Sequence, residues 1–474
     1  MKRISLFYIV TLVLVGVGIM VVLHFGSSLP MPRGAVPAPL ESHSALADLM
    51  SGLTANFDHP LSHLFVQLLV IISVSQVMGK IFSSLGQPAV VGEMAAGILL
   101  GPSLFGLLAP GTFEFVFPDN SLGVLRLLSQ IGVCLFMFTV GMELDVSHVR
   151  SKAQAAILVS HASIVFPYLL GVSLAYFLYD LAAPGATFIA FALFMGISMS
   201  ITAFPVLARI LQERGLSRTF LGSTAITCAA VDDVTAWTIL AFVVAIARAT
   251  SLGGSILNLL LVLVFIAVMV FGIRRGLAHF LRGELQQSEQ PSKGTLAITV
   301  CVVVAAALST EVIGIHALFG AFLAGTIMPE TGNFRHQINV RLEHFSSVLL
   351  LPLFFAFTGL RTQIGLLDEI RGWLLCLLII AVATLGKLGA SAAAARYTGM
   401  SWRDSLQLGA LMNTRGLMEL IALNIGFDLG ILSPRIFTML VIMALTTTML
   451  TGPLLTLFGG RRAVESEVRN PSRA

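Results

Sequence analysis

The sequence predicts an all-α protein that crosses a membrane many times. Of its 474 residues, 56% are hydrophobic and only 11% are charged, whereas soluble domains carry about 25% charged residues. Apolar runs of about 20 residues, the length that a helix needs to cross a bilayer, follow one another along the chain. Short polar or Pro- and Gly-rich segments separate them. We therefore predict a polytopic membrane protein.

The first apolar run, residues 4–23, follows Lys2 and Arg3. It is longer than the apolar core of a signal peptide, about 7–15 residues, and no small-residue cleavage site follows closely. We predict a retained N-terminal helix, with cleavage as a signal peptide as the alternative. Residues 25–60 are rich in Pro, Ser and Ala and are expected to form an external linker. Residues 1–60 thus form the first predicted region.

Residues 61–460 are predicted to form the membrane domain, with thirteen further spans. Charged residues or Pro/Gly clusters interrupt the apolar runs and define the limits. These limits are 62–83, 88–108, 122–144, 153–180, 184–211, 218–248, 254–276, 294–310, 312–330, 342–361, 372–396, 404–427 and 434–459. Residues 461–474 are expected to be a short cytoplasmic tail.

The basic residues between the spans predict the orientation, because cytoplasmic loops carry an excess of Lys and Arg. With the N-terminus in the cytoplasm, most of them fall on the cytoplasmic side, including Arg150, Lys152, Arg274, Arg275, Arg335, Arg341, Arg396 and Arg403. Both termini are then cytoplasmic, in the cell (inner) membrane. No basic tract with interleaved aromatic residues indicates a nucleic-acid partner.

Few charged residues lie deep inside the apolar runs. Asp232 and Asp233 are adjacent in one run, Lys387 lies in a later one, and Arg415 and Glu419 lie in a third. A charged side chain at the bilayer centre costs about 2.5–3.5 kcal/mol on insertion scales, so such groups usually face the protein interior and pair. Lys387 can neutralise one aspartate, which leaves the other to bind a cation or a proton. A purely structural ion pair is the alternative.

Two of the predicted spans are interrupted by polar residues at mid-depth. Residues 198–205 combine Ser and Thr with Pro205, which removes a helical hydrogen bond. Residues 409–416 contain Asn, Thr and Arg between two glycines. Broken helices in two halves of a transporter mark a binding site. The predicted site residues are Ser200 and Thr202 for ion or proton binding, with Pro205, Asn413, Thr414, Arg415 and Glu419 supporting the breaks.

A series of motifs resembles the monovalent cation:proton antiporter-2 family, which includes bacterial sodium/proton antiporters, Kef-type proteins and CHX-type exchangers. The motifs are Gln87–Glu93, Leu100–Ser103, Ser200–Arg209, Val231–Val234, Gly314–Phe322, Pro352–Phe355 and Met412–Leu420, in this order. Together they extend over roughly residues 61–460. The strings Ser200–Pro205 and Met412–Gly416 are most similar to the CHX-type branch.

This resemblance implies an inverted-repeat sodium/proton antiporter fold with thirteen core transmembrane helices and two crossed unwound helices, around Thr202 and Thr414. It implies a core that moves against dimerisation helices, and a homodimer. Asp233 would be the ion-binding aspartate and Asp232 the partner of Lys387, so that both aspartates hold the metal ion, Na⁺ or K⁺. The implied activity is electrogenic exchange of that ion for protons by elevator-like alternating access, with no cofactor beyond the transported ions.

Three other functions are weighed against this one. A symporter or exchanger of a small organic solute would use the same fold, although few deep polar or aromatic residues are present to bind the solute. A membrane enzyme that binds Mg²⁺-diphosphate would use an Asp-x-x-x-Asp type of spacing, but Ala236 stands where the second acid would be. A channel or sensor would need no counter-ion gradient. We predict a transporter and not an enzyme.

Overall fold

The computed structural model describes residues 2–26, 52, 56–57, 59–143, 153–217, 219–248, 252–287, 292–329 and 334–459. Regular structure in these ranges is helical throughout, as predicted. The chain divides into two units, residues 1–58 and residues 59–474. The first contains α1 (Lys2–Gly26), which covers the predicted N-terminal span. Most of the predicted linker and all of the predicted tail, residues 461–474, lie outside the described residues.

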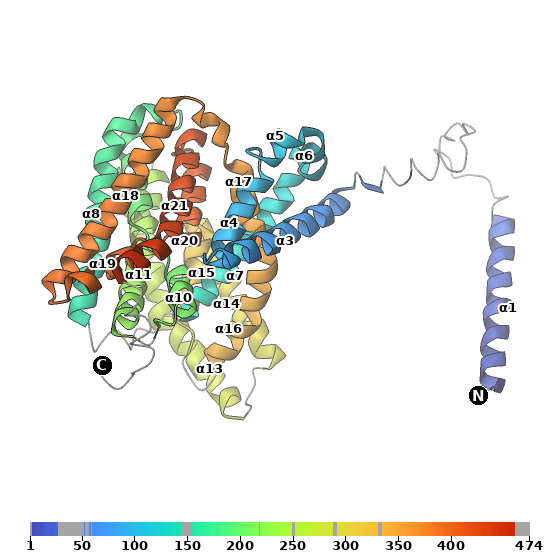
Figure 1. Ribbon diagram of the computed structural model, residues 1–474. Helices are drawn as coiled ribbons and strands as arrows, with labels where there is room; N and C mark the ends of the chain where they lie inside the picture. The colour runs from blue at the N-terminus through green and yellow to red at the C-terminus, as the bar shows by residue number, and fades with distance from the viewer. Residues whose placement is uncertain are drawn as a thin grey trace. The chain divides into compact units, whose positions relative to one another are not determined.

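The second unit is a bundle of helices of very different lengths (Figure 1). They are α3 (Pro60–Ser84), α4 (Ala89–Leu100), α5 (Phe105–Leu108), α6 (Pro110–Val116), α7 (Leu122–Glu143), α8 (Ala153–Leu178), α9 (Phe188–Ser200), α10 (Phe204–Glu213), α11 (Phe220–Arg248), α12 (Leu252–Ala267), α13 (Arg274–Gln287), α14 (Lys293–Ile313), α15 (Ala317–Thr326), α16 (Phe334–Phe345), α17 (Leu351–Arg361), α18 (Ile370–Tyr397), α19 (Trp402–Met412), α20 (Leu417–Asp428) and α21 (Pro434–Gly459). Short 3-10 or π segments are η1 (Asp119–Ser121), η3 (Tyr179–Leu181), η4 (Val268–Ile273), η5 (Ser346–Leu350) and η6 (Ile364–Leu367).

Eleven helical segments among the described residues are long and apolar enough to cross a membrane. They overlap eleven of the predicted spans, with starts that differ most for 122–144, which begins at Pro110, and for 342–361, which begins at Phe334. The polytopic membrane architecture is therefore confirmed. The predicted spans 312–330 and 404–427 instead contain shorter helices, namely α15 and the pair α19 and α20. Each of these is too short to cross alone, because about 20 helical residues are needed. The count of thirteen stays a prediction.

The segment before residue 342 was expected to be a cytoplasmic loop because of its charges, but it is helical from Phe334 onward. Arg335 explains part of the difference. Its guanidinium donates hydrogen bonds to the carbonyls of Thr326 and Met328 at 3.0 Å and of Met142 at 3.3 Å. Arg335 therefore covers carbonyls left open at the end of α15 and near the end of α7, where a cation is favourable.

The helices of the second unit pack in two groups. One group, the aspartate bundle, consists of α8–α11 and α18–α21, in which α8 packs against α9, α11 and α18. The other, the scaffold bundle, consists of α3, α4, α7 and α14–α17, in which α7 packs against α15 and α17. Helix α12 contacts both α11 and α14 and links the groups.

Glycines allow a very close crossing inside the scaffold bundle, between α4 and α17. A Cβ atom added to Gly97 would lie 2.1 Å from the carbonyl oxygen of Phe355, and one added to Gly359 would lie 1.8 Å from that of Gly97. Only glycine permits this approach, which is the usual packing device between membrane helices.

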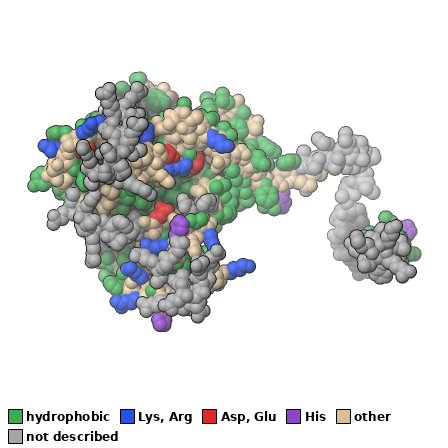
Figure 2. Space-filling view, turned by 60° about the horizontal axis from the view of Figure 1, so that its bottom comes forward, with side chains coloured by type: hydrophobic (Ala, Val, Ile, Leu, Met, Phe, Trp, Pro, Cys, Tyr) green, Lys and Arg blue, Asp and Glu red, His purple; other side chains and the backbone are tan. Residues whose placement is uncertain are grey.

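Basic side chains gather at the end of the second unit that carries α13 and α16 (Figure 2). Exposed residues there include Arg274, Arg275 and Arg341. Hydrophobic side chains cover much of the flank of the same unit in this view. This is the end that the sequence predicts to face the cytoplasm.

Candidate functional site

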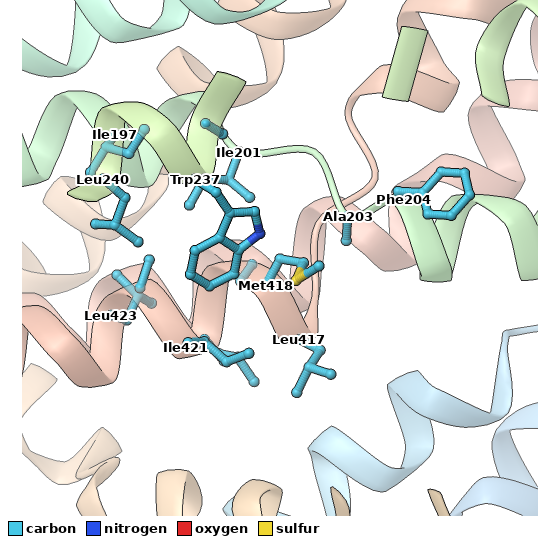
Figure 3. Close-up of a cluster of buried hydrophobic side chains, with 14 of the residues drawn as sticks. Ile197, Ile201, Ala203, Phe204, Trp237, Leu240, Leu417, Met418, Ile421 and Leu423 are labelled. Atoms are coloured by element: carbon cyan, nitrogen blue, oxygen red, sulfur yellow. The ribbon is translucent and has the colours of Figure 1, made fainter. Parts of the chain in front are cut away.

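The two aspartates lie in the middle of α11, and both side chains are fully buried. Successive residues of a helix point about 100° apart, so the two carboxylates face different neighbours. Asp233 shares a helix face with Trp237, one turn further on. Figure 3 shows the Trp237 indole beside Ile201, which follows α9 at the first helix break, and Met418 at the start of α20.

Asp232 is neutralised by its surroundings. Its Oδ2 lies 3.1 Å from Nζ of Lys387 on α18, and its Oδ1 accepts a hydrogen bond of 3.2 Å from the hydroxyl of Ser163 on α8. The Lys387 ammonium also donates to the carbonyl of Ser163 at 3.2 Å and to the carbonyl of Ser200. An ammonium group has three donors, and three acceptors surround this one. The structure thus brings Asp232 and Lys387 together.

Asp233 has the opposite environment. Neither of its carboxylate oxygens has a hydrogen-bond partner among the residues that the structure describes, although both are buried. A buried charge without a partner is strongly disfavoured. Asp233 is therefore a candidate site for a proton or a cation, directly beside an aspartate that is already paired.

The first predicted helix break lies between α9 and α10. The chain is extended at residues 201–203, and Pro205 stands in the first turn of α10, where its missing N–H costs nothing. The freed backbone groups bond to the second break. The Ala203 N–H donates to the Thr414 carbonyl at 3.0 Å, and the Thr202 hydroxyl donates to the Met412 carbonyl at 3.0 Å. The hydroxyl of Ser200 donates to the backbone carbonyls of Ile164 and Gly196 instead of facing a cavity.

The second predicted break lies between α19 and α20. Gly416 has φ +138° and ψ −130°, a conformation that side-chain-bearing residues rarely adopt, and α20 begins directly after it. The Thr414 hydroxyl is 3.3 Å from that of Thr451 on α21. The amide side chain of Asn413 is fully buried and has no hydrogen-bond partner among the described residues. Polar groups thus collect where the two breaks meet.

Arg415 ties the two breaks together. Its guanidinium donates to the carbonyls of Ser198 at 2.6 Å and Met199 at 2.7 Å, which are the last turn of α9, and pairs with Glu419 at 3.0 Å. A cation is favourable at a helix C-terminus because the helix dipole is negative there. All three partners are buried. Arg415 and Glu419 are one helix turn apart and form an ion pair, and the carbonyls of α9 are further partners that sequence spacing did not reveal.

A cavity of about 410 Å³ lies between the two bundles. The scaffold bundle contributes Glu93, Thr139 and Glu143, and the aspartate bundle contributes Arg209 and Gln212. The cavity extends to Ala203, Pro205 and Met418 at the helix breaks, whereas Asp233 is not among its lining residues. It therefore approaches the site through the break that contains Thr202.

Sequence reasoning missed two features of this region. Ser163, which contacts both Asp232 and Lys387, lies in a long apolar span where a lone serine gave no signal. Glu93 was named only as part of the motif Gln87–Glu93, and the structure places it in the lining of the cavity. Its place within a family motif was the available signal.

The chain is similar in sequence to known antiporters. Residues 69–459 match the family described as sodium/hydrogen exchanger, transmembrane. The Na⁺/H⁺ antiporter NhaS4 of Synechocystis sp. is 44% identical over 393 residues, which cover 82% of this chain and 96% of that protein. The cation/H⁺ antiporter 17 of Arabidopsis thaliana is 38% identical over 84% of this chain. The K⁺/H⁺ antiporter 1 of Saccharomyces cerevisiae is 31% identical over 87% of this chain. The match spans 48% of each of these last two proteins.

The fold has a counterpart among solved structures. The sodium proton antiporter NhaP1 of Methanocaldococcus jannaschii aligns with a TM-score of 0.62 at 14% sequence identity, covering 86% of this chain and 99% of that one. At this identity the likeness concerns the fold alone. The family resemblance carried by the sequence motifs is confirmed by the match over residues 69–459. The chain belongs to the sodium/hydrogen exchanger family of cation/proton antiporters.

Proposed function

We propose that this protein exchanges Na⁺ or K⁺ for protons at Asp233. The observation that carries the proposal is the contrast between two neighbouring carboxylates, since Asp232 is paired with Lys387 and Asp233 has no partner among the described residues. The two aspartates and Lys387 together carry one net negative charge. A proton or an alkali cation can bind to Asp233, but not both at once, so the two ligands compete for the same site.

The residues around the aspartates favour this competition. The Thr202 hydroxyl and the backbone carbonyls at the breaks supply oxygen ligands, which alkali cations require. Asp232 becomes a second ligand when the cation arrives, and Lys387 then leaves it and releases its proton. One cation would be exchanged for two protons, and one net charge would cross the membrane in each cycle.

Alternating access is proposed to occur by an elevator-like movement of the aspartate bundle against the scaffold bundle. The cavity between the bundles supports this, because a change in their relative position would close it and open another route. A bare carboxylate is costly in hydrocarbon, so only the loaded site would move. The breaks around Thr202 and Thr414 are proposed to be the two crossed unwound helices of the family fold. We further propose a homodimer that is formed through the scaffold bundle.

The basic end of the second unit is proposed to face the cytoplasm, in the cell membrane, with both termini on that side. The exposed arginines at this end support the assignment through the positive-inside rule. The cavity would then open inward, because Arg209 and Glu143 lie at the cytoplasmic ends of α10 and α7 in this orientation.

The proposal is tested by proton flux into proteoliposomes, with Na⁺, K⁺ and Li⁺ added separately. The wild type is expected to exchange protons for at least one of these cations. The exchange rate of Asp233→Asn is expected to be at least about 100-fold lower, because an amide at this position carries no negative charge and cannot exchange a proton. Asp368→Asn, an exposed position, is the matched control and should retain exchange. Full exchange by Asp233→Asn would reject the site, and cation flux without proton movement would reject the function.

A further inference from the structure

A cluster of charged side chains lies away from the aspartates, at the end of α20. Asp428 is the last residue of α20, and each of its carboxylate oxygens meets an arginine. Oδ1 is 2.6 Å from Arg361 of α17, and Oδ2 is 3.3 Å from Arg126 of α7. A carboxylate at a helix C-terminus is disfavoured by the helix dipole, so the two guanidinium groups compensate for an otherwise unfavourable position. We call Arg126, Arg361 and Asp428 the latch.

The latch is held in a fixed geometry by neighbouring groups. Arg361 also donates to the side-chain oxygen of Asn424 at 2.9 Å, and Asn424 donates to the hydroxyl of Thr358 at 2.8 Å. The Arg361 guanidinium lies over the ring of Phe357 at 4.2 Å and over that of Phe427 at 5.1 Å. Only 13% of the Arg361 side chain and 19% of that of Asp428 are exposed. The ion pair between Arg361 and Asp428 is therefore partly buried, supported by Asn424 and stacked on aromatic rings, and such a pair is stronger than an ordinary surface ion pair. The pair with Arg126 is more exposed, because 46% of the Arg126 side chain is accessible.

Every ion pair of the latch joins the two bundles. Asp428 belongs to the aspartate bundle, and both arginines belong to the scaffold bundle. Beside the latch lies a pocket of only about 30 Å³, which His316, Phe357 and Asn424 line. That volume holds a water molecule or two. The space between the bundles is thus much smaller here than at the large cavity, which measures about 410 Å³.

The latch and the large cavity lie at opposite ends of the same helices. On α7, Arg126 belongs to the latch and Glu143 lines the large cavity. These residues are about 25 Å apart along the helix, at 1.5 Å per residue. On α20, Met418 near the start of the helix lines the large cavity, and Asp428 at its end belongs to the latch. One end of the interface between the bundles is therefore open and the other is shut by ionic contacts.

We propose that the latch is a gate that holds the protein in this one-side-open state and must break when the bundles move to open the opposite side. The inference rests on the alternating access proposed above. Opening the far side requires α20 to move away from α7 and α17, and both ion pairs of the latch span that boundary. Removing the Asp428 charge breaks both ion pairs at once and shifts the population toward the state that opens at the latch.

Cysteine reactivity tests the gate in the full-length protein. The native Cys134, Cys228, Cys301 and Cys376 are replaced by alanine, and one probe is introduced on α7 at a time. Val133→Cys lies at the small cavity beside the latch and Thr139→Cys lies at the large cavity. Modification by a small methanethiosulfonate reagent is followed with and without Asp428→Asn. We expect the probe at 133 to react at least about fivefold faster and the probe at 139 correspondingly slower, the range of a typical two-state coupling.

The controls separate a gate from local loosening. Asp428→Glu should restore both rates, and Asp180→Asn should change neither, because Asp180 pairs with Arg371 inside the aspartate bundle and both are exposed. Faster reaction at 133 with no change at 139 would mean that only local packing was lost, and would overturn the gate. No change at either probe would also overturn it. These rates do not depend on transport, so they stand even if no cation is exchanged.

A second variant covers the case in which Asp428→Asn does not fold. Thr358→Cys with Asn424→Cys places thiols on α17 and α20 at positions whose side chains are in contact. A short bis-thiol crosslinker should stop proton-coupled flux, and a reducible version should allow recovery with reductant. Undiminished flux through crosslinked protein would show that the bundles do not separate here. Absence of flux in the wild type as well would reject the proposed function, and the reactivity test would then decide on the gate.

Discussion

The arrangement of Lys387 shows how one side chain sets the properties of the site. Its ammonium group donates hydrogen bonds to the Asp232 carboxylate and to the backbone carbonyls of Ser163 and Ser200, and all three residues are buried. The amine therefore both compensates one of two deep negative charges and holds α18 against α8 and the end of α9. A role in stability and a role in transport are combined in one residue, and they can be separated by mutation.

Lys387→Met is expected to destabilise the protein by about 3–5 kcal/mol, because it leaves the Asp232 charge buried without its partner. The double variant Asp232→Asn/Lys387→Met should recover most of this loss, since no unpaired charge remains. The free energy of unfolding in mixed micelles measures both. Lys80→Met, at an exposed position of α3, is the control and should be nearly neutral. An equal loss in the single and double variants would argue against a buried ion pair.

The deep residues were predictable from the sequence for a simple reason. A charge inside an apolar run is conspicuous, so Asp232, Asp233, Lys387, Arg415 and Glu419 could all be named. The latch could not be found in this way. Arg126, Arg361 and Asp428 stand near the ends of helices, where charged residues are ordinary, and only the packing of α7, α17 and α20 brings them together.

The two helix breaks depend on different local causes. At the first, Pro205 prevents α9 and α10 from joining, and a sequence shows this directly. At the second, Gly416 permits a backbone conformation that other residues avoid. The sequence predicted an interruption in both places. The hydrogen bonds from Ala203 and Thr202 to the carbonyls of the second break join residues more than 200 positions apart, and no local pattern indicates them.

Gly416→Ala is expected to destabilise the second break by about 1–3 kcal/mol, the usual cost of a strained backbone conformation. The added Cβ would also lie 3.1 Å from Cγ2 of Val206 on α10, so α10 and α20 would have to shift. Gly389→Ala on α18 is the matched control. It has open space around the new Cβ and should be neutral or stabilising by about 0.5–1 kcal/mol, as for other glycines inside helices. Chemical denaturation in micelles compares them, and equal effects would contradict the argument.

At the scale of the molecule, two bundles meet at an interface that is open at one end and closed at the other. The sequence predicted the spans that build these bundles, because apolar length is a local property. It did not predict the pairing of helices, which depends on contacts such as that between Gly97 and Gly359. Residues 312–330 were predicted as a full span because they are largely apolar. In the structure, Gly314 ends α14 with a left-handed cap, and α15 has only 10 helical residues.

The proposed exchange of two protons for one cation predicts that the membrane potential drives transport. Each net charge that crosses is worth about 2.3 kcal/mol per 100 mV, so 100 mV should shift the cation gradient at which flux reverses by about 50-fold. Reversal potentials in proteoliposomes, with Na⁺ or Li⁺ as substrate and the potential clamped by an ionophore, measure this shift. In Asp232→Asn/Lys387→Met only Asp233 remains to bind a proton or a cation. That variant should exchange one cation for one proton, and its reversal gradient should not change with the membrane potential. If the reversal gradient of the wild type is also independent of the membrane potential, Lys387 keeps its proton throughout the cycle and the two-to-one exchange is rejected.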